Sequence, residues 1–153
     1  MAKIELSNIS HTYNPNDTNP TYALNPFSMT WENGKRYAIL GPSGCGKTTM
    51  LNIVSGLVKP SKGKILFDEN DVTDLITEER NIAQVFQFPV IYNTMTVYDN
   101  LAFPLRCRNV TDQKIEERVK SVSDTLRLSS FLNSPARKLT ADQKQLISLG
   151  RGL

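Results

Sequence analysis

The sequence predicts an α/β fold in which a short strand runs through a glycine-rich turn into an amphipathic helix. Residues 3–13 alternate apolar and polar side chains, as a half-buried strand does. Residues 41–49, GPSGCGKTT, place three glycines between an apolar run and a helical pattern. Residues 111–128 repeat apolar side chains at helical spacing. The length of 153 residues suits one compact domain.

The N-terminal part is predicted to be rich in strands. The alternation over 3–13 contains one irregularity, which a strand tolerates. Asn33-Gly34 stands between two apolar-rich runs and predicts a hairpin over 26–40. The second arm of that hairpin, Arg36–Leu40, is the strand expected to lead into the glycine-rich turn.

Two more strands are predicted after the first helix. Residues 63–70 form a short strand that runs into a turn. Residues 82–87, IAQVFQ, form a continuous, β-branched apolar run, which is typical of a buried strand.

Three helices are predicted before residue 129. Thr48–Leu57 carries apolar residues on one face, and Pro60 stops any continuation. Residues 96–105 predict a helix that is interrupted near Pro104. The helix within 111–128 starts from a threonine cap and has the clearest apolar face, made by Ile115, Val119, Val122 and Leu126.

Composition narrows the function classes. The net charge of +3 is spread along the chain, so it does not favour nucleic acid as a partner. No apolar run is long enough to span a membrane, and residues 1–10 lack the pattern of a secretory signal. Cys45 and Cys107 are too few for a disulfide framework, and the lone His11 has no metal ligand at a suitable spacing. We therefore expect a soluble cytoplasmic chain with reduced thiols.

The stretch GPSGCGKTT fits the phosphate-binding pattern G-x-x-x-x-G-K-[ST]. Glycines let successive backbone N–H groups surround a phosphate, and the helix that follows presents its positive dipole end to the same anion. Lys47 supplies a charge for the β- and γ-phosphates, and the hydroxyl of Thr48 is placed to bind Mg²⁺. The predicted ligands are ATP and Mg²⁺. The predicted binding residues are Gly41, Pro42, Ser43, Gly44, Cys45, Gly46, Lys47, Thr48 and Thr49.

Cys45 lies inside this predicted cradle. The helix start and Lys47 favour its thiolate, which is the reactive form of a cysteine. The alternative is a small residue that fills a tight loop and has no part in function, and we favour that alternative.

With this motif and three others in order, the chain resembles the ATP-binding subunits of ABC transporters along its whole length. GPSGCGKTT matches the family's Walker A motif, and Tyr13 matches the aromatic residue that stacks on adenine. Gln87, in AQVFQ, matches the glutamine of the Q-loop, and residues 139–153 stand where the LSGGQ signature and its helix belong. The resemblance implies an antiparallel β subdomain, a RecA-like core and the start of a helical subdomain. It divides the chain into residues 1–93 and 94–153.

The resemblance also implies roles for single residues. Lys47 and Gln87 are the expected catalytic residues, and Thr48 and Gln87 are the expected contacts of the metal and the attacking water. Taken alone, Gln87 would be a polar residue that closes a strand, and Tyr13 would be a core or surface filler. Stacking of a base on an aromatic ring is worth about 1–3 kcal/mol, so loss of the Tyr13 ring is expected to weaken nucleotide binding without abolishing it.

The signature segment is predicted to begin a helix that meets ATP bound to a partner subunit. Its residues are Leu139, Thr140, Ala141, Asp142 and Gln143. Thr140 and Gln143 form a capping-box pattern. Asp142 replaces a family glycine and brings a carboxylate close to a phosphate, which weakens the contact between subunits. Our hypothesis is that the second ATP-binding subunit is a different chain with a more usual signature.

Asp68-Glu69 imitates the acidic Walker B motif, but its position after the P-loop matches a family strand that ends in a turn. The resemblance places Walker B and the catalytic glutamate after the signature helix. We therefore expect that the chain is truncated before them at Leu153, and that it hydrolyses ATP very slowly alone.

The expected function is that of the energising ATPase subunit of an importer for a carbohydrate or a polyol such as glycerol. The apolar segment Phe88–Tyr92 is either ordinary core or the surface that receives the membrane-spanning permease subunits. A solute-binding protein would take part indirectly, and the subunit would lie on the inner face of the cell membrane. The alternatives are a naturally short nucleotide-binding or interaction protein without catalysis, a soluble ABC ATPase of translation or DNA repair, and a small-molecule kinase.

Overall fold

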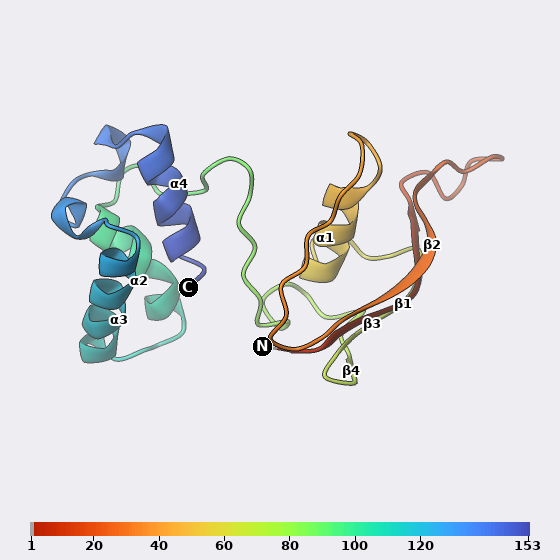
Figure 1. Ribbon diagram of the computed structural model, residues 1–153, viewed down its shortest axis with the longest axis horizontal. Coiled ribbons are helices and arrows are strands. Elements are labelled where there is room, and N and C mark those ends of the chain that lie inside the picture. The colour runs from red at the N-terminus through yellow and green to blue at the C-terminus, as the bar shows by residue number, and fades with distance from the viewer. Residues whose placement is uncertain (1) are drawn as a thin grey trace. The chain divides into compact units, whose positions relative to one another are not determined.

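The computed structural model describes residues 2–153. They form two compact units, one of residues 2–82 and one of residues 83–153 (Figure 1). No helix within 2–153 combines the length and the apolar character needed to cross a lipid bilayer. The division near residue 93 that the sequence suggests for the domains stays a prediction.

The first unit is built on a four-stranded antiparallel sheet in the order β2-β1-β3-β4. Its strands are β1 (Ile4–Thr12), β2 (Tyr22–Trp31), β3 (Lys62–Phe67) and β4 (Asn70–Asp71). The predicted strand over 3–13 is therefore correct, and its irregularity is a bulge at Asn8, where φ is 50° and the register with both neighbouring strands shifts.

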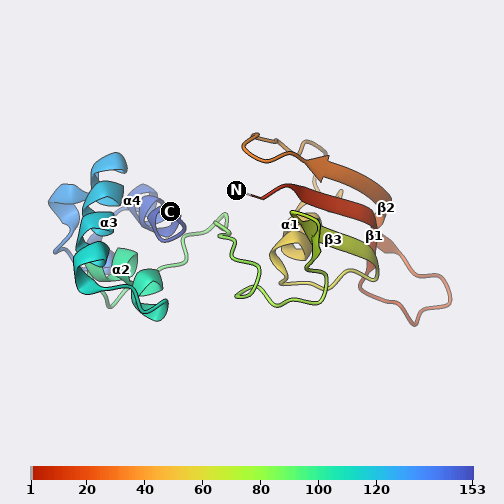
Figure 2. The same cartoon turned by 90° about the horizontal axis from the view of Figure 1, so that it is seen from below.

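The helix α1 (Lys47–Ser55) packs on one face of this sheet (Figure 2). Met50, Ile53 and Val54 from the helix join Ile9 and Ile65 from the strands in a single apolar core. The helix ends at Gly56 in a left-handed cap, with φ of 80°, so Leu57 lies beyond it and is exposed. The glycine stops the helix before Pro60 can do so, which corrects the predicted end.

The second unit packs three helices around their own core. These are α2 (Val97–Cys107), α3 (Asp112–Thr125) and α4 (Ala141–Gly150), and short 3-10 turns occupy Ser129–Phe131 and Ala136–Lys138. The core side chains are Val97, Leu101, Ala102, Ile115, Val119, Val122, Leu128, Ala136 and Ile147. The apolar face predicted for residues 111–128 is thus buried as expected, although Leu126 is only half-buried.

The helix α2 runs through Pro104 without a break, so the predicted interruption is wrong. Pro104 removes one backbone hydrogen bond, the one that its N–H would donate to the carbonyl oxygen of Asn100, and the helix continues to Cys107. Thr96 caps the other end by accepting a hydrogen bond from the backbone N–H of Asp99 at 3.0 Å.

Two predicted strands do not form. Residues 36–40 and 82–87 have no strand structure, and Leu40 is 89% exposed. Val85 and Phe86 are also exposed, so the segment 82–87 is not buried as predicted. A strand exists through hydrogen bonds to its neighbours, and within residues 2–153 no strand pairs with either segment.

The hairpin predicted over 26–40 is wrong for the same reason. β2 pairs with β1, and after Trp31 the chain turns at Asn33-Gly34 without returning beside β2. The backbone N–H of Glu32 donates to the hydroxyl of Tyr37 at 2.9 Å, and the rings of Trp31 and Tyr37 lie 6.2 Å apart. These side-chain contacts and one backbone hydrogen bond, from the N–H of Lys35 to the carbonyl oxygen of Glu32 at 3.3 Å, hold the turn in place of a ladder between two strands.

Candidate functional site

The glycine-rich turn of residues 41–46 leads directly into α1, as predicted. Gly44 and Gly46 have φ of 81° and 90°, which side-chain-bearing residues rarely adopt. A Cβ on Gly46 would also lie 2.4 Å from the carbonyl oxygen of Ala23, so only glycine fits between the helix start and β2. The turn is thus specified by backbone conformation and by close packing.

Lys47 folds back over the turn. Its Nζ atom donates to the carbonyl oxygens of Gly41 at 2.8 Å and Pro42 at 2.7 Å. Nζ also lies 3.5 Å from the Sγ atom of Cys45, which is exposed. These contacts hold the ammonium group at the helix start, where an anion would meet it.

The N-terminus of α1 is open to an anion. The first amides of a helix have no intrahelical acceptor, and here the cap residue, Gly46, has no side chain to bind them. No acidic residue lies in the first turn. The hydroxyl of Thr48 is on an exposed residue and has no hydrogen-bond partner within residues 2–153. A positive dipole end, free amides, a lysine and a hydroxyl are thus gathered in one place.

Tyr13 lies beside this helix start. Its hydroxyl is 3.3 Å from the hydroxyl of Thr49, and its ring packs edge-to-face on the buried ring of His11, with centroids 4.6 Å apart. The tyrosine remains 60% exposed. The structure therefore brings the predicted base-stacking residue and the predicted phosphate cradle together within one unit, and it leaves the tyrosine accessible.

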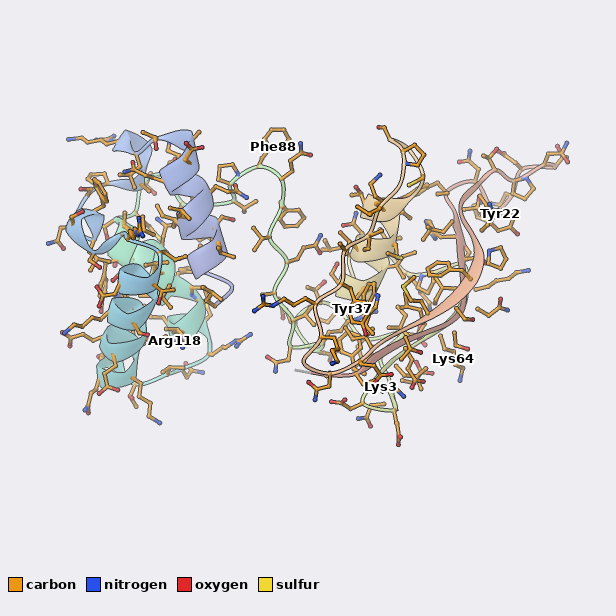
Figure 3. All side chains as sticks on the ribbon, viewed as in Figure 1. Lys3, Tyr22, Tyr37, Lys64, Phe88 and Arg118 are labelled. Atoms are coloured by element: carbon orange, nitrogen blue, oxygen red, sulfur yellow. The ribbon has the colours of Figure 1, made fainter. Side chains whose placement is uncertain are left out.

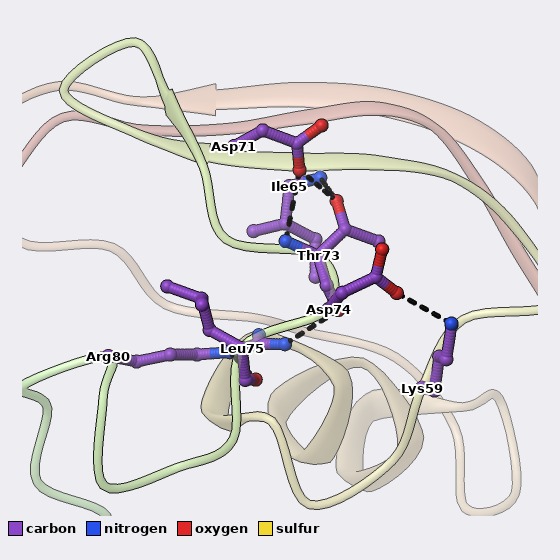
Figure 4. Close-up of polar contacts among 7 residues, drawn as sticks. All are labelled: Lys59, Ile65, Asp71, Thr73, Asp74, Leu75 and Arg80. Carbon is purple, nitrogen blue, oxygen red and sulfur yellow. Dashed lines mark hydrogen bonds and ion pairs between the residues drawn. The ribbon is translucent and has the colours of Figure 1, made fainter.

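Arg80 holds the far end of the same helix, and Figure 4 shows it beside the loop residues Thr73 and Leu75, which it also contacts. Its guanidinium donates to the carbonyl oxygens of Ile53 at 2.8 Å and Val54 at 3.0 Å, in the last turn of α1. It also donates to the carbonyl oxygens of Leu75 and Thr73. Arg80 is only 4% exposed, and this burial lowers its pKa from the ordinary value, an effect that the nearby charge of Asp74 opposes. A cation at a helix C-terminus is favourable because the dipole is negative there.

Asp68 and Glu69 lie outside the cradle. They form the two-residue turn between β3 and β4, with φ of 46° and 70°. The carboxylate of Asp68 accepts a hydrogen bond from the backbone N–H of Lys3 at 2.8 Å. This agrees with the prediction that the pair is a turn and not a metal-binding motif.

Gln87 and the segment Phe88–Tyr92 belong to the second unit. Gln87 is exposed and lies in irregular backbone. Phe88 is 77% exposed, and its ring projects away from the chain around it (Figure 3). Val90 and Tyr92 are also exposed, whereas Ile91 is half-buried against the helical core, so the core interpretation holds for Ile91 and is wrong for the three exposed side chains.

The signature segment begins α4 with the predicted capping box. The backbone N–H of Thr140 donates to Oε1 of Gln143 at 3.0 Å, and the backbone N–H of Gln143 donates to the hydroxyl of Thr140 at 3.3 Å. Ala141 and Asp142 are exposed in the first turn, and Leu139 is half-buried. The start of α4 is therefore well defined and accessible.

Sequence reasoning missed Arg80 and Asn100. The side chain of Asn100 is fully buried and bonds to the backbone N–H and carbonyl of Tyr92 and to the carbonyl of Thr96. A signal for Asn100 existed, because it is a polar residue beside Leu101 in an apolar helical pattern. Arg80 had no such signal, since it stands in a polar run that is typical of a loop.

The fold and the cradle define a class of protein, and comparison with known families agrees. The family model described as ABC transporter matches residues 24–153. The chain belongs to the ABC transporter family.

Two curated relatives illustrate the match. The trehalose/maltose import ATP-binding protein MalK of Thermococcus litoralis is 42% identical over 137 residues, which cover 86% of this chain and 37% of the relative. The sn-glycerol-3-phosphate import ATP-binding protein UgpC of Cupriavidus metallidurans is 38% identical over the whole chain and 41% of the relative. The chain spans about two fifths of the length of these relatives.

Solved structures confirm the predicted fold class. An ATP-binding cassette of an ABC transporter in its ADP conformation matches all of this chain and 65% of its own length, with a TM-score of 0.80 and 26% identity. A dimeric cassette in a post-hydrolysis state with ADP and Pi matches 98% of this chain and 68% of its own length, with a TM-score of 0.84 and 28% identity.

Proposed function

We propose that the chain binds ATP through residues 41–49 and Tyr13, as the energising ATPase subunit of an ABC importer. The observation that carries the proposal is the open start of α1, where Lys47, free amides and glycine backbone meet beside an exposed tyrosine. Triphosphate oxygens suit the amides and the ammonium, and the exposed ring of Tyr13 suits adenine. Support also comes from the ADP-bound structures that the chain resembles.

Magnesium fits the proposed site because its preferred ligands are oxygen atoms. The hydroxyl of Thr48 is exposed at the helix start and would take one position on the ion. Bound there, the ion would neutralise phosphate charge and orient the γ-phosphate. Gln87 is proposed as a second contact of the metal and the attacking water.

Hydrolysis is proposed to be very slow in this chain alone. No acidic residue lies in the first turn of α1, and the carboxylate of Asp68 is bonded to the backbone of Lys3. Neither the first turn of α1 nor Asp68 would therefore supply a general base for a water molecule at the γ-phosphate. We propose that catalysis takes place in a pair of subunits, with the signature of each facing the ATP of the other.

The solute is proposed to be a carbohydrate or a polyol such as glycerol. Relatives named for trehalose/maltose and for sn-glycerol-3-phosphate support this class. A spermidine/putrescine import ATP-binding protein of Hahella chejuensis is also 39% identical over 130 residues. Uptake measured with the assembled transporter tests the solute, and faster uptake of a polyamine than of any carbohydrate or polyol would contradict the proposed class.

The partners are proposed to be permease subunits, which would contact the exposed segment Phe88–Tyr92 on the inner face of the membrane. The second ATP-binding subunit is proposed to be a different chain, because Asp142 places a carboxylate in the first turn of the signature helix. In the assembled transporter, Asp142→Gly is expected to raise the ATPase rate, and an unchanged rate would contradict the proposed weakening by Asp142.

Equilibrium binding of Mg-ATP to the 153-residue chain tests the proposal. Lys47→Ala is expected to weaken binding at least about tenfold, because a charge-assisted contact with phosphate is lost. Lys59→Ala is the matched control, since Lys59 is an exposed lysine of the same unit in a surface ion pair with Asp74. Equal affinities for the unmodified chain and the Lys47→Ala variant would overturn the proposed site.

A further inference from the structure

One face of the signature helix, α4, forms hydrogen bonds with the backbone of the segment 83–92, which contains Gln87. Nε2 of Gln145 donates to the carbonyl oxygen of Phe86 at 2.9 Å. The backbone N–H of Val90 donates to the hydroxyl of Ser148 at 3.4 Å, and the guanidinium of Arg151 donates to the carbonyl oxygen of Val90 at 2.5 Å. Residues 145, 148 and 151 are spaced by three, which places them on the same side of a helix.

Arg151 makes a second contact with the same segment. Its guanidinium lies over the ring of Tyr92, 4.8 Å from the centroid. The other side of the segment is held by α2, because Tyr92 packs on Phe103 and its backbone is bonded to Asn100. The end of the segment is therefore fixed between α4 and α2 within one unit.

The segment 83–92 has no regular secondary structure of its own, so these side chains supply its main attachments. Two of its apolar side chains are nevertheless largely exposed, Phe88 at 77% and Val90 at 53%, while Ile91 packs against the core. A fixed backbone that displays exposed apolar groups is suited to contact with another molecule, because little further ordering is needed on binding.

We propose that Gln145, Ser148 and Arg151 are positioning residues that make the Phe88–Tyr92 segment move with the signature helix. α4 is one continuous helix of ten residues that starts in a capping box, so a displacement of its first turn also displaces its last turn. From Gln143 to Arg151 the helix rises about 12 Å. Engagement of a partner's ATP at the helix start would thus be passed to the exposed segment. The inference rests on the proposed function, which places ATP at that end.

Hydrogen exchange of the full 153-residue chain measures the attachment directly. Arg151→Gln is expected to speed exchange at the amides of Val90 and Tyr92 about tenfold, because a hydrogen bond from a charged donor and the contact with the ring are lost. Arg108→Gln is the matched control, since Arg108 is exposed in the same unit and its side chain has no hydrogen-bond partner within residues 2–153. Unchanged exchange in the Arg151→Gln variant would overturn the inference.

A double variant separates positioning from general loosening of the unit. Tyr92→Leu removes the ring under Arg151 and is expected to speed exchange at Val90. Adding Arg151→Gln to it is expected to give less than the product of the two effects, because both remove the same contact. Strictly multiplicative effects, or faster exchange throughout α2 and α3, would contradict a specific link between Arg151 and the segment.

The assembled transporter supplies the functional readout. Arg151→Gln is expected to leave the affinity for Mg-ATP within about twofold. It is expected to lower the solute transported per ATP hydrolysed at least about threefold, because the lost attachment changes the local opening of the segment about tenfold. Arg151→Lys keeps the charge over Tyr92 and is expected to restore part of the coupling. An unchanged ratio of solute transported to ATP hydrolysed in the Arg151→Gln variant would overturn the inference and would not affect the proposed ATP binding. Absence of ATP binding by the unmodified chain would refute the proposed function instead.

Discussion

Arg80 shows how one buried charge can stabilise the end of a functional helix. Its guanidinium fork meets four carbonyl oxygens, two of them in the last turn of α1. Gly56 makes room for it, because a Cβ there would lie 2.7 Å from Nε of Arg80. The helix whose start forms the candidate site is thus fixed at its other end by a residue outside that site.

Replacing Arg80 is expected to destabilise the first unit. Arg80→Met leaves the carbonyl oxygen of Val54 buried without the guanidinium donor and that of Ile53 with only the backbone N–H of Gly56, and we expect a loss of about 3 kcal/mol. The fluorescence of Trp31, the single tryptophan of the chain, reports urea unfolding of this unit. Arg36→Met is the control, since Arg36 is exposed. Equal midpoints for the two variants would contradict the structural role of Arg80.

Glu69 shows a residue in a conformation that suits glycine. It occupies the second central position of the turn between β3 and β4 with φ of 70°. Such two-residue hairpin turns favour glycine, because a Cβ raises the energy of the left-handed conformation.

Glu69→Gly is therefore expected to stabilise the first unit by about 1 kcal/mol. Glu69→Ala removes the same charge but keeps the Cβ, and we expect no comparable gain from it. Trp31 fluorescence during urea unfolding measures both. A gain of similar size in the alanine variant would assign the effect to charge and not to backbone conformation.

At the scale of elements, the sequence predicted best what depends on nearby residues. The apolar faces of α1 and α3, the capping box of α4 and the turn at Asp68-Glu69 arise from contacts between positions close in sequence. The segments 36–40 and 82–87 also have strand-like patterns, yet neither is a strand. Strand formation depends on a neighbour elsewhere in the chain, which a local pattern does not contain.

The start of α2 offers a test of electrostatics at a helix cap. The hydroxyl of Thr96 donates to the carboxylate of Asp99 at 2.6 Å, and Arg106 pairs with the same carboxylate at 3.1 Å. These contacts lower the pKa of Asp99 below its ordinary value. Because the folded-state pKa is depressed, the stabilisation is present above the unfolded pKa and is lost as the pH falls through the folded pKa.

Asp99→Asn is expected to destabilise the second unit at neutral pH by less than about 1 kcal/mol, since the carboxylate is partly exposed. The difference from the unmodified chain should stay constant from neutral pH down to the unfolded pKa of an aspartate, shrink below it, and vanish below the folded pKa of Asp99. Helical circular dichroism during urea unfolding at several pH values measures it. Asp112→Asn, at an exposed first-turn position of α3, is the control. A difference that does not depend on pH would contradict the electrostatic explanation.

At the scale of the whole molecule, the predicted site residues fall into two groups. Tyr13 and residues 41–49 lie together in the first unit, and Gln87, Phe88–Tyr92 and the signature segment lie in the second. The motif spacing in the sequence predicts both groups. It did not reveal Arg80 or the α4 face, because those residues act on backbone atoms that no local pattern identifies. Asn100 was missed although its position in an apolar helical pattern gave a signal.

We propose that the nucleotide binds at the start of α1. Titration of the isotope-labelled 153-residue chain with Mg-ATP, followed by amide chemical shifts, tests it most directly. We predict the largest shifts at the amides of Gly44 to Thr49, because these groups would bind the phosphates, with a smaller shift at Tyr13. Saturable shifts confined to other residues, with Gly44 to Thr49 unmoved, would contradict the account.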